Sequence, residues 1–131
     1  MATIRKEIAT RAPAAAAWDA MRDVGALHTR LVVGFVLDTR LDGDCRIVKF
    51  ANGHEARERI VAIDDRLHRV AYSVVGGVCA HHHASAEIVA DGDGSRVVWT
   101  CDLLPDSVAP TIEAMMENGA QAMKRTLDAS V

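Results

Sequence analysis

Six short β-rich segments follow one another between Leu31 and Leu103, and one long amphipathic segment closes the chain. Turn-forming residues separate each β-rich segment from the next, as in strands joined by short connections. Such strands pair with their sequence neighbours, so the pattern predicts an antiparallel meander. The predicted strands are Leu31–Asp38, Cys45–Ala51, His54–Ile63, Leu67–Val75, His81–Ala90 and Ser95–Leu103.

The segment that follows the meander predicts a helix from Ser107 to about Ala129. Its apolar residues recur every three or four positions and therefore share one side of a helix. A helix of this length extends over about 34 Å, enough to cross a whole sheet. The apolar stripe consists of Val108, Ile112, Met115, Met116, Gly119, Met123 and Leu127.

The first thirty residues add one strand and one helix. Thr3–Thr10 fits a strand, and a helix runs from Pro13 to about Val24, followed by a helical turn or loop at Gly25–Arg30. This order predicts one α+β domain over residues 1–131, in which helices cover one face of an antiparallel sheet.

Composition limits the partners and the location of the chain. Of 131 residues, 50% are hydrophobic and 25% charged, and the net charge of −3 comes without a basic cluster. We therefore expect no nucleic-acid partner. No apolar run approaches the roughly 20 residues of a membrane helix, so membrane insertion is not expected either. Three unpatterned cysteines (Cys45, Cys79 and Cys101) and no apolar leader indicate a cytoplasmic location.

The dipeptide Asn52-Gly53 predicts the register of the strands beside it, because Asn-Gly between two strands is typical of a two-residue hairpin turn. Such a turn pairs Ile47 with Glu58. The inner face of this hairpin is then Cys45, Ile47, Lys49, Ala51, His54, Ala56, Glu58, Ile60 and Ala62. The outer face, which includes Arg46, Val48 and Phe50, is predicted to contact solvent.

The remaining turns predict the inner faces of the later strands. An even-length turn at residues 91–94 places Ala84, Ala86 and Ile88 on the face of Val97, Trp99 and Cys101. Short loops place Tyr72 opposite both Glu58 and Ala84. The inner residues of the strand between them are then His68, Val70, Tyr72 and Val74.

The predicted inner faces contain many alanines, and the facing helix offers Gly119, Ala120 and Ala122. Small side chains on both sides leave space between sheet and helix. An apolar cavity bordered by a few polar groups is typical of a small-molecule site, and methionines would give it an adaptable surface. The expected ligand-binding residues are Lys49, Glu58, His68, Tyr72, His82, Trp99, Met116 and Met123.

Glu58 is the best catalytic candidate, with two interpretations. A desolvated carboxyl group can transfer protons near neutral pH. Alternatively, Glu58 forms an ion pair with Lys49 or a hydrogen bond with Tyr72 and has a structural role. His68 and His82 could orient a ligand carbonyl or shuttle protons, or be structural histidines.

The run His81-His82-His83 raises the question of a metal site. On a strand, His81 and His83 share one face at a separation of roughly 6.8 Å, and Asp102 or Cys79 could add a ligand. A solvent-exposed histidine cluster is the simpler interpretation, so we expect no metal and no cofactor. The chain contains no nucleophile-elbow or phosphate-binding motif.

The chain resembles the START-like, or SRPBCC, superfamily with its helix-grip fold, in the polyketide cyclase/dehydrase and lipid-transport branch. The resemblance is in the segments PAAAAWDAMRD (13–23), GALH (25–28), NG (52–53), ERI (58–60), IDD (63–65), VAYS (70–73) and GSRVVW (94–99). It implies a curved antiparallel sheet of about seven strands around a long C-terminal helix, with a hydrophobic ligand held between them. Glu58, Tyr72 and Trp99 match recurrent positions of the family, and no catalytic set is implied.

Three hypotheses for function follow. The first is a module that binds a small hydrophobic or aromatic molecule between the sheet and the last helix. The second is a cyclase or dehydratase that uses Glu58 for proton transfer. The third is an interaction module that forms a homodimer through a sheet edge or a patch at Val48 and Phe50.

Overall fold

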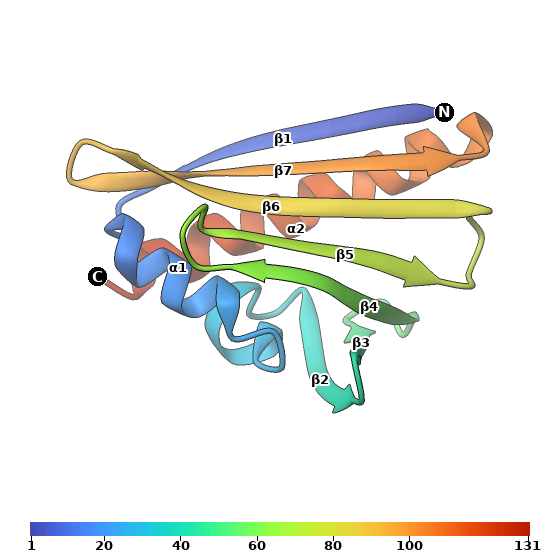
Figure 1. Ribbon diagram of the computed structural model, residues 1–131, viewed down its shortest axis with the longest axis horizontal. Helices are drawn as coiled ribbons and strands as arrows, with labels where there is room; N and C mark the ends of the chain where they lie inside the picture. Colours follow the sequence, from blue (N-terminus) through green and yellow to red (C-terminus); the bar gives the residue numbers. More distant parts are fainter.

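The computed structural model describes residues 1–131, which form seven strands and two α-helices (Figure 1). The strands are β1 (Ala2–Thr10), β2 (Val36–Asp42), β3 (Cys45–Phe50), β4 (Glu55–Asp64), β5 (Arg69–Val75), β6 (His81–Asp91) and β7 (Gly94–Leu104). The helices are α1 (Ala14–Arg22) and α2 (Ala109–Ala129), with a π-helical turn η1 (Leu27–Leu31) and a 3₁₀ turn η2 (Asp106–Val108).

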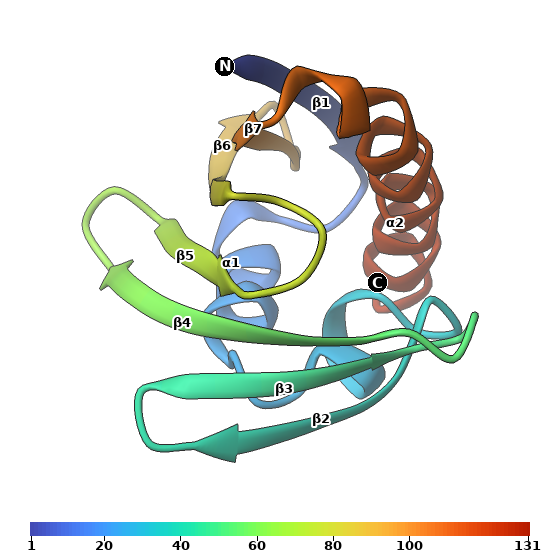
Figure 2. The same cartoon turned by 90° about the vertical axis from the view of Figure 1, so that its right-hand side faces the viewer.

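All seven strands form one antiparallel sheet in the order β1-β7-β6-β5-β4-β3-β2. The first strand therefore pairs with the last, while β2 to β7 form the predicted meander. The sheet curves strongly and faces α2 with its concave side (Figure 2). This arrangement confirms the predicted α+β helix-grip fold.

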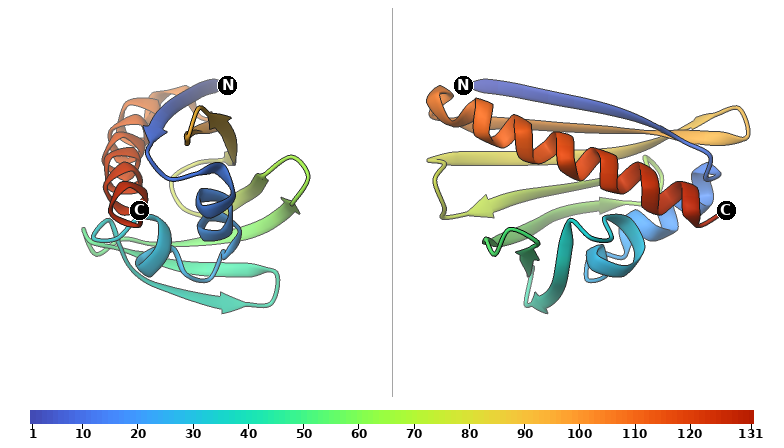
Figure 3. Two further views of the ribbon diagram at one scale, coloured as in Figure 1. Left: turned by 90° about the vertical axis from the view of Figure 1, so that its left-hand side faces the viewer. Right: turned by 180° about the vertical axis from the view of Figure 1, so that it is seen from behind.

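The two α-helices cover different parts of the concave side. α2 runs obliquely across the sheet and packs along β1, whereas α1 and η1 lie at one end of the curve (Figure 3). The buried residues of α2 are Ile112, Met116, Gly119, Ala120, Ala122, Met123 and Leu127, in good agreement with the predicted stripe. None of the helices is long and apolar enough to cross a membrane.

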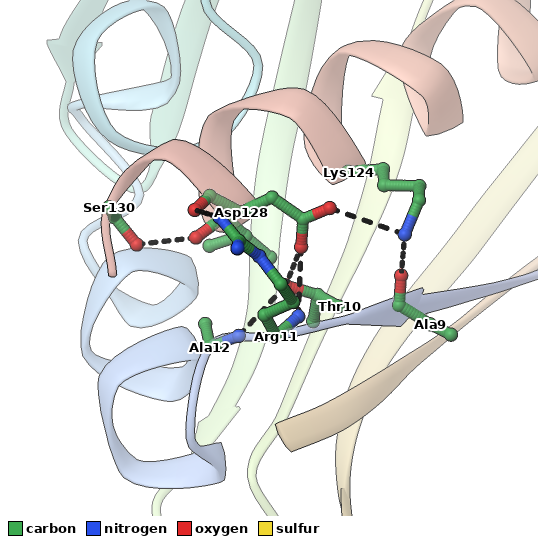
Figure 4. A network of polar contacts seen from close by, with 8 residues as sticks. Ala9, Thr10, Arg11, Ala12, Lys124, Asp128 and Ser130 are labelled. Atoms are coloured by element: carbon green, nitrogen blue, oxygen red, sulfur yellow. Dashed lines mark hydrogen bonds and ion pairs between the residues drawn. The ribbon is translucent and has the colours of Figure 1, made fainter. Parts of the chain in front are cut away.

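Polar contacts fix the C-terminal end of α2 to the end of β1 (Figure 4). The carboxylate of Asp128 accepts hydrogen bonds from the Thr10 hydroxyl at 2.9 Å and from the Arg11 backbone N–H at 2.8 Å. Lys124 donates to the Ala9 carbonyl at 2.7 Å. Toward the other end of α2, Lys6 forms an ion pair with Glu117 at 3.0 Å. These contacts hold α2 against the edge of the sheet.

The first strand of the predicted meander begins later than expected. Leu31–Asp38 was predicted as a strand, but η1 ends at Leu31 and β2 begins at Val36. Leu27 and Leu31 lie one helical turn apart, and both are buried in the main core. The apolar run is therefore divided between a helical turn and a strand, and each part buries its own residues.

The register predicted for β3 is wrong by one residue. The turn has three residues instead of two, because the Phe50 N–H donates to the His54 carbonyl and Arg46, not Ile47, pairs with Glu58. The two-residue turn needs positive φ at both central residues. Only Gly53 has one, at 87°, while the Asn52 side chain accepts a hydrogen bond from the His54 N–H.

This shift reverses the two faces of β3. Arg46, Val48 and Phe50 point to the concave side, and Lys49 is exposed on the convex side. Val48 is only 1% exposed. The predicted solvent-facing patch at Val48 and Phe50 is therefore absent, and with it one of the two surfaces suggested for a homodimer.

The other registers are closer to expectation. Tyr72 pairs with Ala84, as predicted. Ala84 and Ala86 pair with Cys101 and Trp99, so these residues share one face, as predicted. Glu58 lies opposite Val74 rather than Tyr72, because β4 contains a bulge at residue 61 and the β4–β5 loop has four residues instead of three. The two changes together shift the pairing by two residues, an even number, so the same side chains point inward. Glu58 and Tyr72 therefore still share the concave face.

Candidate functional site

A cavity of about 120 Å³ lies between the concave face of the sheet and α2. Seventeen of its twenty lining residues are hydrophobic. The floor comes from β3 to β7, α2 covers it, and η1 with the start of β2 closes one side. Phe35, Phe50, His82 and Met115 line the cavity and are only partly buried, so the cavity wall reaches solvent at these side chains.

Six of the eight residues predicted to contact a ligand line this cavity. They are Glu58, Tyr72, His82, Trp99, Met116 and Met123. Lys49 and His68 do not. Lys49 points away from the cavity because of the register shift in β3. His68 ends the β4–β5 loop with a positive φ of 52°, and its ring stacks on Trp18 at 5.3 Å between centroids.

Arg46 occupies the position that Lys49 was expected to fill. Its Nε donates to Glu58 Oε1 at 2.8 Å, and the two side chains are only 6% and 9% exposed. Its Nη1 donates to the Val24 carbonyl at 3.3 Å, and its guanidinium lies 5.0 Å from the centre of the Tyr72 ring. Glu58 thus forms an ion pair, which was one of the alternatives considered, but its partner is Arg46 instead of Lys49.

Tyr72 and Trp99 form a second polar contact in the cavity. The Trp99 Nε1–H donates to the Tyr72 hydroxyl oxygen at 3.0 Å. Burial raises the pKa of Tyr72 well above its usual range, and the nearby Glu58 carboxylate raises it further. Tyr72 therefore keeps its proton at neutral pH. Together with the ion pair, this contact makes one polar strip in an otherwise apolar cavity.

Two further titratable side chains reach the cavity. Burial lowers the pKa of His82, and the neighbouring charge of His81 adds to this effect. His82 is therefore a neutral group at the edge of the cavity near pH 7. Burial raises the pKa of the Cys101 thiol to about 12, so Cys101 behaves as a small apolar residue there.

The histidine run lies outside this arrangement, apart from His82. His83 Nδ1 is 3.1 Å from the Ser73 hydroxyl, and Asp102 accepts a hydrogen bond from Thr3 at 2.6 Å. His81 is exposed at the start of β6. No three histidine, cysteine, aspartate or glutamate side chains are grouped closely enough to hold a metal ion.

Sequence reasoning missed Arg46, Val48 and Phe50 because it assumed a two-residue turn. The alternative three-residue turn at the same Asn-Gly pair places all three on the face of Glu58. The signal available in the sequence for a polar cavity residue was Arg46, a single arginine between Cys45 and Ile47 in a predicted strand. Phe35 was also missed, because it lies between η1 and β2, where the sequence pattern had predicted a continuous strand.

Comparison with known proteins identifies the family. Residues 1–129 match the family model described as polyketide cyclase / dehydrase and lipid transport. No curated protein matches the chain significantly.

Three solved structures illustrate the similarity. XoxI from Bacillus cereus is 15% identical, with a TM-score of 0.86 over 100% of this chain and 99% of XoxI. A START superfamily protein from Mycobacterium smegmatis is 10% identical, with a TM-score of 0.75 over 98% and 96% of the two chains. Norcoclaurine synthase from Thalictrum flavum, determined with dopamine and hydroxybenzaldehyde, is 18% identical, with a TM-score of 0.72 over 98% and 85%.

These structures share the curved sheet and long C-terminal helix described above. The model match covers nearly the whole sequence, and the fold agrees with it. The chain therefore belongs to the polyketide cyclase/dehydrase and lipid-transport family.

Proposed function

We propose that this protein binds a small, mainly apolar molecule about the size of one aromatic ring in the cavity between the sheet and α2. The observation that supports this proposal is an apolar cavity of about 120 Å³ with a single polar strip on its wall. A dry cavity of roughly 150 Å³ in another protein accepts benzene. Drug-sized ligands occupy about 300 Å³ or more, so a long lipid would not fit without rearrangement.

A similar protein supports an aromatic ligand. Norcoclaurine synthase, which has the same fold, was determined with dopamine and hydroxybenzaldehyde, both small aromatic molecules. In this protein the cavity offers Trp99, Phe35 and Phe50 for contacts with an aromatic ring. Methionines at four further positions can adapt to its outline.

The methionines provide a direct test. Met21, Met115, Met116 and Met123 line the cavity, whereas Met1 is 65% exposed at the N-terminus. In a titration of methyl-labelled protein with toluene, the NMR signals of the four cavity methyl groups should shift together and saturate. The Met1 signal should not move. Shifts of Met1 alone, or no saturable shift, would contradict the proposal.

A second candidate function is proton transfer by Glu58 to or from a bound substrate. The observation that favours it is that Glu58 is the only carboxylate on the cavity wall. If it holds, Glu58→Gln should abolish turnover of a substrate that the wild-type protein converts, although the variant still binds that substrate. A variant that keeps the wild-type rate would rule this role out.

A further inference from the structure

The polar strip of the cavity keeps hydrogen-bonding atoms that no protein group uses. Glu58 Oε1 accepts from Arg46, but Glu58 Oε2 has no donor in the protein. Every fully buried side-chain nitrogen or oxygen has a hydrogen-bond partner. Oε2 must therefore keep accessible surface, and because Glu58 is more than nine-tenths buried and lines the cavity, that surface faces the cavity.

Tyr72 supplies the complementary group. Its oxygen accepts from Trp99, but its own O–H proton has no acceptor in the protein. Arg46 pairs directly with Glu58 across β3 and β4, and Tyr72 lies diagonally from Glu58 on β5, opposite Ile60. Diagonal neighbours on one face are within reach of long side chains. The strip thus presents a free acceptor and a free donor side by side.

The strip carries no net charge. The guanidinium of Arg46 and the carboxylate of Glu58 cancel each other, and no other charged side chain lines the cavity. His82 is neutral near pH 7. A charged ligand would therefore bring an uncompensated charge into an apolar space, which is costly.

We infer that the ligand is a neutral, single-ring molecule with a hydroxyl group, such as a phenol, whose O–H donates to Glu58 Oε2 and whose oxygen accepts from the Tyr72 hydroxyl. This inference rests on the proposed function, since it specifies the chemistry of the molecule in the same cavity. It predicts that the affinity depends more on the hydroxyl group than on which ring carries it.

Four probes that share one methylphenyl ring test the inference on the wild-type protein. They are toluene, p-cresol, p-toluate and p-methylbenzylamine, titrated at neutral pH and followed by the cavity methionine signals. A hydrogen bond to a charged group predicts that p-cresol binds at least about tenfold tighter than toluene. The anion and the cation should bind more weakly than p-cresol by at least about the same factor.

The outcomes separate the two proposals. If toluene binds and p-cresol binds no tighter, or p-toluate or the amine binds best, the inference is wrong while the proposed function stands. If none of the four moves a cavity methionine, the proposed function fails and the inference fails with it.

Substitutions assign the contacts. Tyr72→Phe should weaken p-cresol binding by about fivefold and leave toluene binding unchanged, which also shows that the variant is folded. Ser85→Ala removes a hydroxyl from the convex face of β6 and should change neither affinity. Glu58→Gln leaves the charge of Arg46 unpaired. The affinity for p-toluate should therefore rise relative to the affinity for p-cresol. Equal losses of p-cresol and toluene affinity in Tyr72→Phe would contradict the assigned contact.

Discussion

Arg46 and Glu58 are oppositely charged residues buried together on neighbouring strands of an apolar surface. Removing one partner of such a pair leaves a buried charge without compensation, whereas replacing both with apolar residues is often tolerated. The pair therefore matters for stability mainly as a unit. It also fixes the position of the Glu58 carboxylate relative to Tyr72, whose ring lies beside the guanidinium.

A double-mutant cycle tests this dependence. Arg46→Met should lower the free energy of unfolding by about 3–5 kcal/mol, and adding Glu58→Leu should restore much of the loss. Urea denaturation measures both. The control is Arg59→Met, because Arg59 is 55% exposed and forms a surface pair with Asp44 at 3.5 Å. The control should cost less than about 1 kcal/mol. A double variant no more stable than Arg46→Met would contradict the coupling.

At the scale of elements, sequence patterns predicted most strands and the long helix, because alternation and helical periodicity are strong over many residues. The register of β3 was not predictable with the same certainty. It depends on whether Asn52 adopts a left-handed conformation or accepts a hydrogen bond from His54, and both are compatible with Asn-Gly. One such local choice decided whether Lys49 or Arg46 reached the cavity.

The junction of α2 with β1 gives a prediction with a defined pH dependence. The backbone N–H of Arg11, followed by the Thr10 hydroxyl and Lys124, holds the pKa of Asp128 below its usual 3.8. The ionised form is thus favoured in the folded state. Its stabilisation is complete above the pKa of the unfolded chain and is lost as pH falls through the lower folded value.

Asp128→Asn should accordingly lower the free energy of unfolding by about 1–2 kcal/mol at neutral pH. The difference from wild type should shrink as the pH is lowered through the acid range. Chemical denaturation at several pH values measures it, with Asp93→Asn in the exposed β6–β7 turn as the control. A difference that stays constant with pH would show that the Asp128 charge is not responsible.

At the scale of the whole molecule, the cavity exists because a curved sheet and a straight helix cannot meet along their full length. Gly119 lets α2 approach closely at one point, since a Cβ there would lie 3.1–3.2 Å from Phe35 and Trp99. Elsewhere, small residues such as Ala86 leave the space open. The alanine-rich face predicted this space from the sequence, but its size depends on the distance between helix and sheet.

Filling the space should weaken binding without disturbing the fold. Ala86 lines the cavity beside Trp99, its partner on the neighbouring strand. Ala86→Leu should weaken toluene binding by more than about tenfold, because the added carbons occupy the ligand volume. Ala90→Leu places the same side chain on the same strand at an exposed position outside the cavity and should bind normally. If isothermal titration calorimetry gave both variants the same affinity for toluene, the ligand would not lie at Ala86.

The most direct test of the account is a crystal structure of the protein grown with toluene. We predict electron density for one ring between Trp99, Val48 and Met116, with α2 in the position described here. The contrary result is a ring bound elsewhere, such as the second groove, which Asp19 of α1 and Arg125 near the end of α2 help to line. A structure in which α2 has closed onto the sheet and no cavity remains would also contradict the prediction.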